Sequence, residues 1–396
     1  MFNKKTKKRI GIDARFYGPL GKGLGRYVQE VVDNIVSMTV TSSEFEYVIF
    51  LSPDNFKDFK SSHPNVRKIE VPWRWYSWRE QLFFPLILKK EKLDLVHFPH
   101  FNVPILTPVP FVVTIHDLIL TRFSSRRASM LPAAFYWFKQ AAYRLVIRTA
   151  IRRARAIITV SEFTRRDIIK KFKANPKKLF VTYEGVADLD KKEIIGEIEE
   201  KQVLQRYRIS EPFLLYVGNA YPHKNLEVLL TVFNNLLSRH HHLKLVMVGK
   251  DDYFYHRVKE KASALSLWQS EGSDNNKVIF PGYVPDADLA VLYRRALFYV
   301  FPSLYEGFGL PPLEAMSHSC PVVSSNQASL PEVIGDAALY FDPYNQADML
   351  SKLEFLFENE DYRQQLIARG LKRVNVFSWQ KCARQTLEIY RKILVE

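Results

Sequence analysis

A chain of 396 residues is too long for a single ordinary core, so two domains of roughly 150 to 200 residues are expected. Hydrophobic residues make up 47% of the sequence, with 28 Phe, 20 Tyr and 6 Trp, which argues against a disordered or low-complexity protein. The formal net charge of +15 indicates an anionic partner, and the absence of a nucleic-acid recognition motif favours anionic lipid or a phosphorylated small molecule.

Other global features predict a soluble, cytoplasmic chain. Cys320 and Cys382 lie far apart without metal-ligand spacing, which predicts a reducing compartment and no disulfide framework. The basic segment 1–9 leads straight into a short strand and lacks the apolar region of a secretory signal. The most apolar stretch, residues 103–120, is interrupted by three prolines, a histidine and an aspartate, so we do not expect it to span a membrane.

Strand-like and helix-like segments alternate along the first half, which predicts parallel strands joined by crossover helices. The expected strands are short apolar runs at residues 9–13, 47–51, 94–97, 111–115 and 156–160. A helix is expected over residues 27–36, where apolar residues recur at helical spacing. Ser161 is expected to cap a further helix over residues 162–172.

A glycine-rich turn, residues 18–26, follows the first expected strand. Gly23 and Gly25 lie in this turn, but the spacing is not G-x-G-x-x-G, so the turn does not predict a dinucleotide site. A turn of this composition leaves backbone amides uncovered for an anion. A purely structural turn is the alternative.

Basic and aromatic residues are interleaved between residues 73 and 79, and basic residues gather again between residues 122 and 155. Amphipathic side chains of this kind settle in the headgroup region of a lipid surface. The pattern favours peripheral attachment to an anionic membrane, on the inner face of the plasma membrane. A solvated basic face around a well-packed aromatic core is the alternative.

His116 closes the strand expected at residues 111–115. Ligands of open parallel sheets bind beyond the carboxyl ends of the strands, so a histidine at this place can face a substrate. His116 is therefore a candidate catalytic residue. The alternative is a histidine that only forms hydrogen bonds within its own loop.

A charged segment, residues 191–208, separates the first half from a second α/β series and is expected to be a linker. The strands expected in that series lie at residues 213–217, 244–248, 278–280, 298–301 and 321–325. The helices expected between them lie at residues 226–239, 255–268 and 286–295. The sequence thus predicts an α/β protein with two Rossmann-like, doubly wound parallel-sheet domains that face a cleft, over residues 1–190 and 209–376.

The loop after the strand at residues 213–217 carries Gly218, Asn219, His223 and Lys224. Lys224 lies at the start of the next helix, where its ammonium and the helix N-terminus both favour a diphosphate. It would neutralise the negative charge that develops on a departing phosphate. A lysine at a solvated helix start is the alternative.

Glu306 and Glu314 are separated by seven residues that include Gly307, Gly309 and two adjacent prolines. The glycines permit a tight turn, and the prolines suit the first turn of a helix. We therefore expect Glu306 on a loop at a strand end and Glu314 inside the next helix, whose positive end would hold a phosphate. A nucleotide-sugar, with phosphates between two hydroxyl-rich rings, suits such a site. A corner with two surface glutamates is the alternative.

The segment from Glu306 to Glu314 resembles the signature of retaining glycosyltransferases of the two-Rossmann-domain (GT-B) type, family 4. The runs at residues 321–325 and 330–343 are similar to the same family. The resemblance implies a nucleotide-diphosphate sugar donor, with Glu314 accepting a hydrogen bond from the ribose. Glu306 and the following amides would hold the sugar hydroxyls. Those amides belong to Gly307, Phe308, Gly309 and Leu310.

The resemblance also implies contacts outside this segment. The loop with Gly23 and Gly25 would approach the donor phosphates, and His116 would lie near the transferred sugar and the acceptor. Tyr283 and Val284, after the strand at residues 278–280, would lie beside the nucleotide base. The final segment, 377–396, would cross back to the first domain as a helix.

One position departs from the family pattern. The family often has an arginine just after the glycine that corresponds to Gly218, where this chain has Asn219. The cationic clamp on the diphosphate would then rest on Lys224, with weaker help from His223.

Together, the residues and the resemblance predict a retaining glycosyltransferase without a cofactor. We expect it to be metal-independent, because no Asp-x-Asp pair is placed to hold a divalent ion. The resemblance is nearest to mannosyltransferases of bacterial surface-polysaccharide assembly, which implies GDP-mannose as donor and a lipid-linked or oligosaccharide acceptor. A nucleotide-sugar epimerase or a phosphorylase on the same fold is one alternative. A non-catalytic protein that binds a membrane surface is another.

Overall fold

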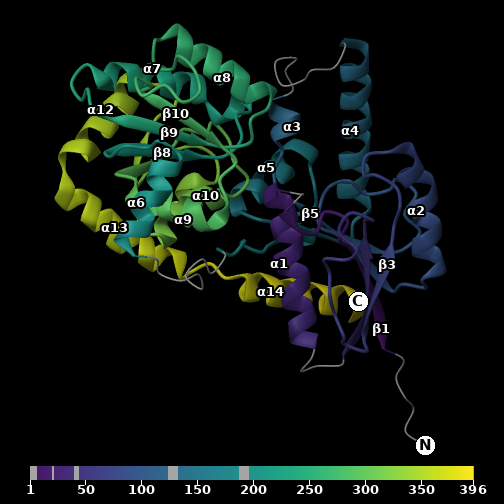
Figure 1. Cartoon of the computed structure of the whole chain (residues 1–396). Coiled ribbons are helices and arrows are strands. Elements are labelled where there is room, and N and C mark those ends of the chain that lie inside the picture. Colours follow the sequence, from purple (N-terminus) through teal and green to yellow (C-terminus); the bar gives the residue numbers. More distant parts are fainter. Residues whose placement is uncertain (1–6, 20–21, 40–43, 124–132, 187–195, 396) are drawn as a thin grey trace, which may run out of the picture. The chain divides into compact units, whose positions relative to one another are not determined.

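The computed structural model describes residues 7–19, 22–39, 44–123, 133–186 and 196–395. The chain divides into two compact units, each built on one parallel sheet (Figure 1). The first unit comprises Met1–Gly185 with Ser378–Glu396, and the second comprises Val186–Phe377. The α/β class with two doubly wound parallel sheets is confirmed.

The sheet of the first unit has seven parallel strands in the order β3-β2-β1-β4-β5-β6-β7. The strands are β1 (Lys8–Asp13), β2 (Phe45–Leu51), β3 (Val66–Glu70), β4 (Leu95–Phe98), β5 (Phe111–Ile115), β6 (Ala156–Thr159) and β7 (Leu179–Val181). The chain runs outward from β1 to β3 and then returns to β4 on the other side of β1. The strand order therefore reverses between β1 and β4, which is the topological switch point of this sheet.

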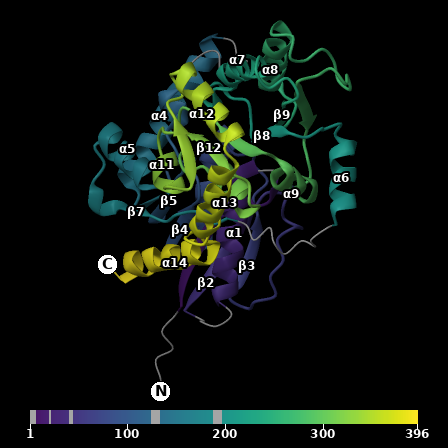
Figure 2. The same ribbon diagram turned by 90° about the vertical axis from the view of Figure 1, so that its left-hand side faces the viewer.

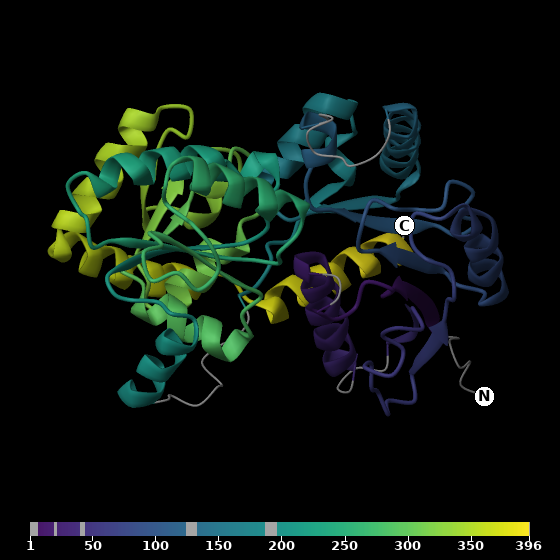
Figure 3. The ribbon, with the colours of Figure 1, turned by 45° about the horizontal axis from the view of Figure 1, so that its top comes forward.

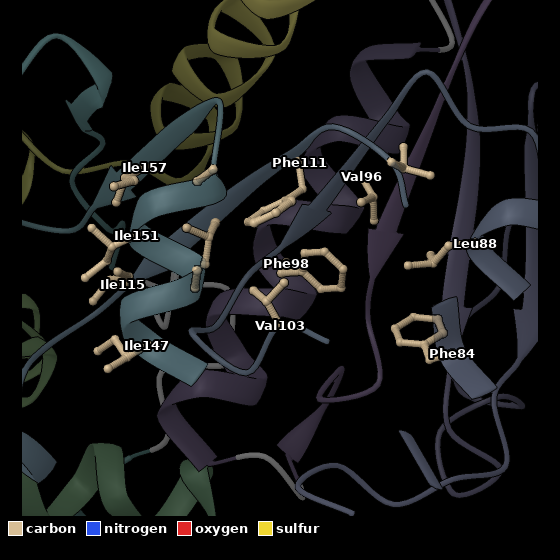
Figure 4. Packing of buried hydrophobic residues seen from close by; sticks show 14 of the residues in the cluster. Phe84, Leu88, Val96, Phe98, Val103, Phe111, Ile115, Ile147, Ile151 and Ile157 are labelled. Carbon is tan, nitrogen blue, oxygen red and sulfur yellow. The ribbon is translucent and has the colours of Figure 1, made fainter. Parts of the chain in front are cut away.

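The helices of this unit are α1 (Lys22–Thr39), α2 (Trp78–Lys90), α3 (Ile119–Arg122), α4 (Ala133–Arg153), α5 (Glu162–Phe172) and α14 (Trp379–Val395). Helices α2 and α4 cover the same face of the sheet. Figure 4 shows Phe84 and Leu88 of α2 on the side of Phe98, and Ile147 and Ile151 of α4 near the strand residues Ile115 and Ile157. These side chains belong to one buried hydrophobic core.

The opposite face of the sheet is covered by α1 and α14, which pack side by side (Figures 1 and 3). Nδ1 of His97 lies 2.6 Å from the hydroxyl of Tyr390 in α14. The hydroxyl of Thr114 lies 3.2 Å from that of Tyr27 in α1. Because successive strand residues point to opposite faces, His97 and its neighbour Phe98 contact helices on different sides. The C-terminal helix thus belongs to the first unit.

The second sheet has six parallel strands in the order β10-β9-β8-β11-β12-β13, with its switch point between β8 and β11. The strands are β8 (Phe213–Val217), β9 (Lys244–Val248), β10 (Val278–Gly282), β11 (Phe298–Phe301), β12 (Val322–Ser325) and β13 (Ala338–Phe341). The helices are α6 (Glu197–Arg206), α7 (Leu226–Leu237), α8 (Tyr253–Ala264), α9 (Asp286–Arg295), α10 (Leu310–Ser317), α11 (Leu330–Ile334), α12 (Gln346–Glu358) and α13 (Glu360–Val374). Helix α12 packs against α7 (Figure 2).

Several boundaries differ from the sequence predictions. Helix α1 begins at Lys22, so Gly23 and Gly25, which were expected in the preceding turn, lie in its first turn. Helix α6 occupies much of the expected linker 191–208 and buries Val203 and Leu204, and residues 191–195 lie outside the described part. Strands β3, β7 and β13 and helices α2, α4, α12 and α13 were not predicted. Within the residues that the structure describes, no helix is both long and apolar enough to cross a membrane.

Candidate functional site

The switch point of the second sheet brings together two predicted catalytic residues. Lys224 lies on the loop that follows β8, and Glu306 lies on the loop that follows β11. Nζ of Lys224 lies 2.5 Å from Oε1 of Glu306. Their side chains are buried, with exposed fractions of 10% and 11%. Ligands of open α/β sheets bind beyond the carboxyl ends of the strands at such a point, so this ion pair marks the candidate site.

The two loops are tied together by their backbones. Pro222–Lys224 forms one turn of 3-10 helix, and Asn225 adopts a left-handed conformation with φ of 62° before α7 begins. The backbone N–H of Leu304 donates to the carbonyl of His223 at 2.8 Å. These contacts hold the Lys224 ammonium above the ring of Phe301 at 5.3 Å from its centroid. A carboxylate and an aromatic face thus balance the buried ammonium, and an anionic ligand would compete with Glu306 for it.

The glycine loop that follows Glu306 is fixed by a buried serine. The hydroxyl of Ser329 lies 3.0 Å from the carbonyl oxygens of both Glu306 and Phe308. Gly309 has φ of 104°, and a Cβ at this position would come within 2.8 Å of a methyl group of Leu330. A side chain would therefore be strained and would clash at this position. Helix α10 begins immediately after the glycine, as predicted.

Glu314 lies in the second turn of α10, at Leu310–Ser317. Its carboxylate is half-buried, and Oε2 lies 3.5 Å from the hydroxyl of Tyr293 on α9. The two glutamates flank the N-terminal end of α10 along the chain. The positive end of the helix dipole therefore lies between two carboxylate-bearing segments.

The loop after β8 carries three further residues predicted to contact the donor, Gly218, Asn219 and His223. The carbonyl of Asn219 accepts a hydrogen bond from the hydroxyl of Tyr216 at 2.7 Å, and that of Gly218 accepts one from Tyr255 at 2.9 Å. Burial and the charge of Lys224 lower the pKa of His223 to about 4. His223 is therefore neutral near pH 7. As a neutral ring, His223 can donate or accept a hydrogen bond, so any help that it gives Lys224 in holding a diphosphate would come from hydrogen bonding.

Tyr283 and Val284 follow β10 directly. The ring of Tyr283 is 75% exposed, whereas Val284 is buried. Tyr283 is thus the accessible member of the pair. Its ring is therefore accessible to a nucleotide base, beside which the resemblance is expected to place it.

His116 lies in the first unit, directly after β5. Its Nδ1 lies 3.1 Å from Oε1 of Glu184, and its Nε2 lies 2.9 Å from the carbonyl of Pro99. Burial alone would lower the pKa of His116, but the hydrogen bond and charge of Glu184 and the Pro99 carbonyl outweigh burial and raise it. As an imidazolium, His116 donates to both partners. Both ring nitrogens are engaged, and their partners lie in the segments after β7 and β4 rather than within the loop of His116 itself.

Gly23 and Gly25 lie in the first turn of α1. A Cβ on Gly25 would collide with the carbonyl oxygens of Gly18 and Phe16, whereas a Cβ on Gly23 would meet nothing within 4 Å. Gly25 therefore allows the loop after β1 to pack against the helix. Gly23 leaves the first turn open to solvent.

Sequence reasoning missed the contacts of Ser329 and Phe301. Ser329 precedes the Leu-Pro pair that starts α11, a place typical of a helix cap, and that signal could have drawn attention to it. Nothing in the sequence indicates that the ring of Phe301 lies beneath Lys224. In the described part of the chain, no three His, Cys, Asp or Glu side chains are grouped so that they could hold a metal ion.

Curated relatives include an O-antigen chain mannosyltransferase B from Escherichia coli, 38% identical over 244 residues, which are 60% of this chain and 61% of that protein. The O-antigen chain mannosyltransferase RfbU of Salmonella typhimurium is 26% identical over 85% of this chain and 88% of its own length. The matched region thus covers less than two thirds of the length of this first relative.

Among solved structures, Anabaena HepE in complex with UDP and glucose matches the fold with a TM-score of 0.70. The match is 14% identical and covers 97% of this chain and 100% of that one. The family described as glycosyl transferases group 1 matches residues 197–373, and the family described as glycosyltransferase family 4 matches residues 22–188. One match lies in each unit, so the first unit carries a glycosyltransferase family 4 domain and the second a group 1 glycosyltransferase domain, in a chain with the GT-B fold.

Proposed function

We propose that the protein is a retaining hexosyltransferase that transfers mannose from GDP-mannose to a lipid-linked or oligosaccharide acceptor in bacterial surface-polysaccharide synthesis. The observation that carries the proposal is the buried Lys224–Glu306 pair at the switch point of the second sheet. The pair adjoins the glycine loop that leads into α10. A site with one ammonium, one helix N-terminus and two nearby carboxylates fits a diphosphate between two hydroxylated rings.

The geometry supports a simple division of roles. The Lys224 ammonium and the amides at the start of α10 would neutralise the charge that grows on the diphosphate as its bond to the sugar breaks. These groups would supply that charge stabilisation without a metal ion. Glu306 and the backbone from Gly307 to Leu310 would hold the sugar hydroxyls. Glu314 would accept a hydrogen bond from the ribose, and Tyr283 with Val284 would flank the base.

Retention of configuration requires the acceptor oxygen to form its bond on the face that the phosphate leaves. The bond from the anomeric carbon to the phosphate oxygen breaks, and a bond from the same carbon to the acceptor oxygen forms. The departing phosphate oxygen can take the proton of the acceptor hydroxyl. No carboxylate nucleophile is then needed. The proposal gives His116 an orienting role, because its Nε2 proton is committed to the carbonyl of Pro99.

We propose mannose as the transferred sugar and GDP as the nucleotide because the named relatives are O-antigen mannosyltransferases. The HepE structure holds UDP with glucose, so the base and the sugar need a direct test. A thermal-shift panel of GDP, UDP, ADP and their sugar conjugates provides one, because a ligand that binds only the folded chain raises its melting temperature. We expect the largest shifts with GDP and GDP-mannose. The absence of a shift with every nucleotide would contradict the proposal, and conversion of a nucleotide-sugar without an acceptor would favour the epimerase.

The proposal includes peripheral attachment to an anionic membrane through the outer faces of α2 and α4. On α2, Trp78, Leu82 and Leu86 follow one another at helical spacing, and Trp78 and Leu86 are 65% and 61% exposed. The acidic side chain of α2, Glu80, is fully buried, and both lysines lie in its last turn. An exposed apolar stripe with basic ends suits the interface of a bilayer.

Helix α4 continues this surface. Its sequence contains no acidic residue, and its exposed residues include Trp137, Phe138 and Leu145 among lysine and arginine. The loop that joins β4 to β5 is tied to both helices: Ile105 N–H donates to Gln81 of α2 at 2.9 Å, and Arg153 of α4 donates to the carbonyl of Thr107 at 2.7 Å. Helices α2 and α4 cover the same face of the sheet, so their outer sides present one basic, apolar surface.

Sedimentation with vesicles tests this attachment. We expect the protein to bind vesicles that contain phosphatidylglycerol more than vesicles of phosphatidylcholine alone, and to lose binding when Trp78, Leu82 and Leu86 are changed to serine. A matched control changes the exposed Tyr344 and Leu371 of the second unit to serine. Equal binding of the α2 variant and the control would contradict the role of α2.

A further inference from the structure

The switch point of the first sheet carries a set of aromatic side chains with no role in the donor site. The segments that follow β1 and β4 flank this point, and the residues just before α2 join them. Phe16 lies 4.4 Å from Trp75 and 5.4 Å from His100 between ring centroids. The ring of Tyr76 lies 5.9 Å from that of His100 and 6.2 Å from that of Phe101. Three chain segments thus meet where ligands of open α/β sheets bind.

A buried ion network lies beneath these rings. Arg15 donates two hydrogen bonds to Asp13, at 2.7 and 2.6 Å, and one to Glu80 at 2.5 Å. The side-chain amide of Asn102 donates to the same Glu80 carboxylate at 2.8 Å. Arg15 and Glu80 are fully buried. A buried charge is tolerated only when it is paired and hydrogen-bonded, so this network fixes the three segments to one another.

Tyr76 is the exposed residue that this network positions. Its backbone N–H donates to Oε2 of Glu80 at 2.7 Å, and its φ of 63° lies in the left-handed region that a residue with a bulky side chain rarely adopts. Backbone strain of this kind persists where the surroundings impose it, and it occurs frequently at functional sites. The ring is nevertheless 54% exposed. The protein thus holds a large aromatic ring at the surface in an unfavourable backbone conformation.

Polar groups surround the hydroxyl end of this ring. The hydroxyl of Tyr76 lies 3.3 Å from Nδ1 of His100. Burial lowers the pKa of His100 to about 3, with a further contribution from His116, so its ring is neutral and can donate or accept a hydrogen bond. Desolvation and the carboxylates of Glu80 and Asp117 raise the pKa of Tyr76, so its hydroxyl remains protonated. His116 donates to the carbonyl of Pro99 and thereby fixes the loop that carries His100.

We propose that Tyr76 is the stacking platform for a saccharide ring of the acceptor, and that His100 and the Tyr76 hydroxyl bond its hydroxyl groups. The inference rests on the proposed glycosyltransferase activity. The C–H face of a hexose ring packs against an aromatic face, whose π electrons are attracted to the polarised hydrogens. A site with an apolar ring and a few fixed polar groups is typical of small-molecule recognition.

The test compares Tyr76→Gly, Tyr76→Phe and a control, Tyr344→Ala, for binding of mannobiose, mannotriose and N-acetylglucosaminyl-mannose by saturation-transfer NMR. Glycine suits the left-handed backbone, so Tyr76→Gly removes the ring without adding strain. We expect the wild type to bind at least one of these sugars, Tyr76→Gly to weaken that binding by roughly tenfold or more, and Tyr76→Phe to weaken it less. The control should bind as the wild type does.

Two further measurements distinguish acceptor binding at Tyr76 from donor binding and from membrane attachment. Binding of GDP, measured by thermal shift, should be the same in Tyr76→Gly as in the wild type. Failure of the donor-site proposal would appear as absent GDP binding, whereas failure of the Tyr76 proposal would appear in the sugar titration. Binding of phosphatidylglycerol vesicles should also be retained. No binding of any of the sugars by the wild type, or equal binding by Tyr76→Gly, would overturn the proposal, and loss of vesicle binding alone would assign Tyr76 to the membrane surface.

Discussion

The switch points of the two sheets occupy equivalent places in their units but carry different chemistry. In the second unit, the buried Lys224–Glu306 pair adjoins a glycine loop and a helix N-terminus. In the first unit, aromatic rings lie on the fully buried network of Arg15, Asp13 and Glu80. The fold therefore fixes where a ligand binds, and the side chains determine which ligand it is. A charge-balancing site suits a diphosphate, whereas a ring-lined site suits an uncharged sugar.

The Lys224–Glu306 pair and the Arg15 network differ in whether the cation can bind a further anion. Lys224 has a carboxylate on one side and the ring of Phe301 on another, so a bound anion can replace Glu306 as its partner. Arg15 already makes three hydrogen bonds to two carboxylates and packs over the ring of Phe84 at 4.5 Å. We infer that the first pair takes part in ligand binding and that the second holds the protein framework.

The largest effect is expected at Lys224. Lys224→Met should lower turnover about 100- to 1,000-fold, because the ammonium that stabilises the departing diphosphate is lost. The variant also leaves the buried Glu306 carboxylate unpaired, which lowers stability. The double variant Lys224→Met with Glu306→Gln should recover the melting temperature but not the turnover. Near-normal transfer by either variant would remove the leaving-group role of Lys224.

A smaller effect, on folding rather than on chemistry, is expected at Glu80. Glu80→Ala leaves Arg15 with one carboxylate fewer and frees the backbone N–H of Tyr76, so we expect a loss of about 3–5 kcal/mol in the free energy of unfolding. Glu80→Gln keeps the shape and an acceptor oxygen and should lose less. Urea denaturation measures both. If Glu80→Ala unfolds at the same urea concentration as the wild type, the network does not hold this part of the first unit.

The smallest effect is a pH dependence at His116. Its pKa is raised above the ordinary value of 6.5 by Glu184 and Pro99 despite the opposing effect of burial. The protonated ring therefore stabilises the fold fully below about pH 6.5, and this contribution is lost as pH rises through the raised pKa. We expect the stability advantage of the wild type over His116→Gln to shrink as the pH increases. A constant or growing advantage would show that His116 is not held as an imidazolium.

Local patterns predicted much of the fold. The apolar run of β5 and the Ser161 cap of α5, whose side chain accepts from the N–H of Thr164, lie where the sequence placed them. Strands β3 and β7 were missed because β3 is an edge strand with three charged residues among five and β7 has only three residues. Charged residues are common on edge strands, and in β3 they obscure the apolar alternation by which a strand is recognised.

For the candidate site, the sequence predicted the arrangement of residues close together in the chain but not the contacts between distant ones. Glu306, Gly309 and Glu314 lie close together in the sequence, so turn and helix chemistry identified their arrangement. The Lys224–Glu306 contact joins residues 82 positions apart, and the Arg15–Glu80 contact joins residues 65 positions apart. Such contacts depend on the strand order, which local composition does not specify. The left-handed backbone of Tyr76 was not predicted either, because it accompanies a hydrogen bond from its N–H to the buried Glu80.

The account depends most on a nucleoside diphosphate held by Lys224 and Glu314 in the second unit. Calorimetric titration of GDP into the wild type, Lys224→Met and Glu314→Ala measures this directly. We expect the affinity to fall by about tenfold or more in each variant, because each loses a hydrogen bond to a charged group. Unchanged GDP affinity in both variants would contradict the assignment of the donor site to this switch point.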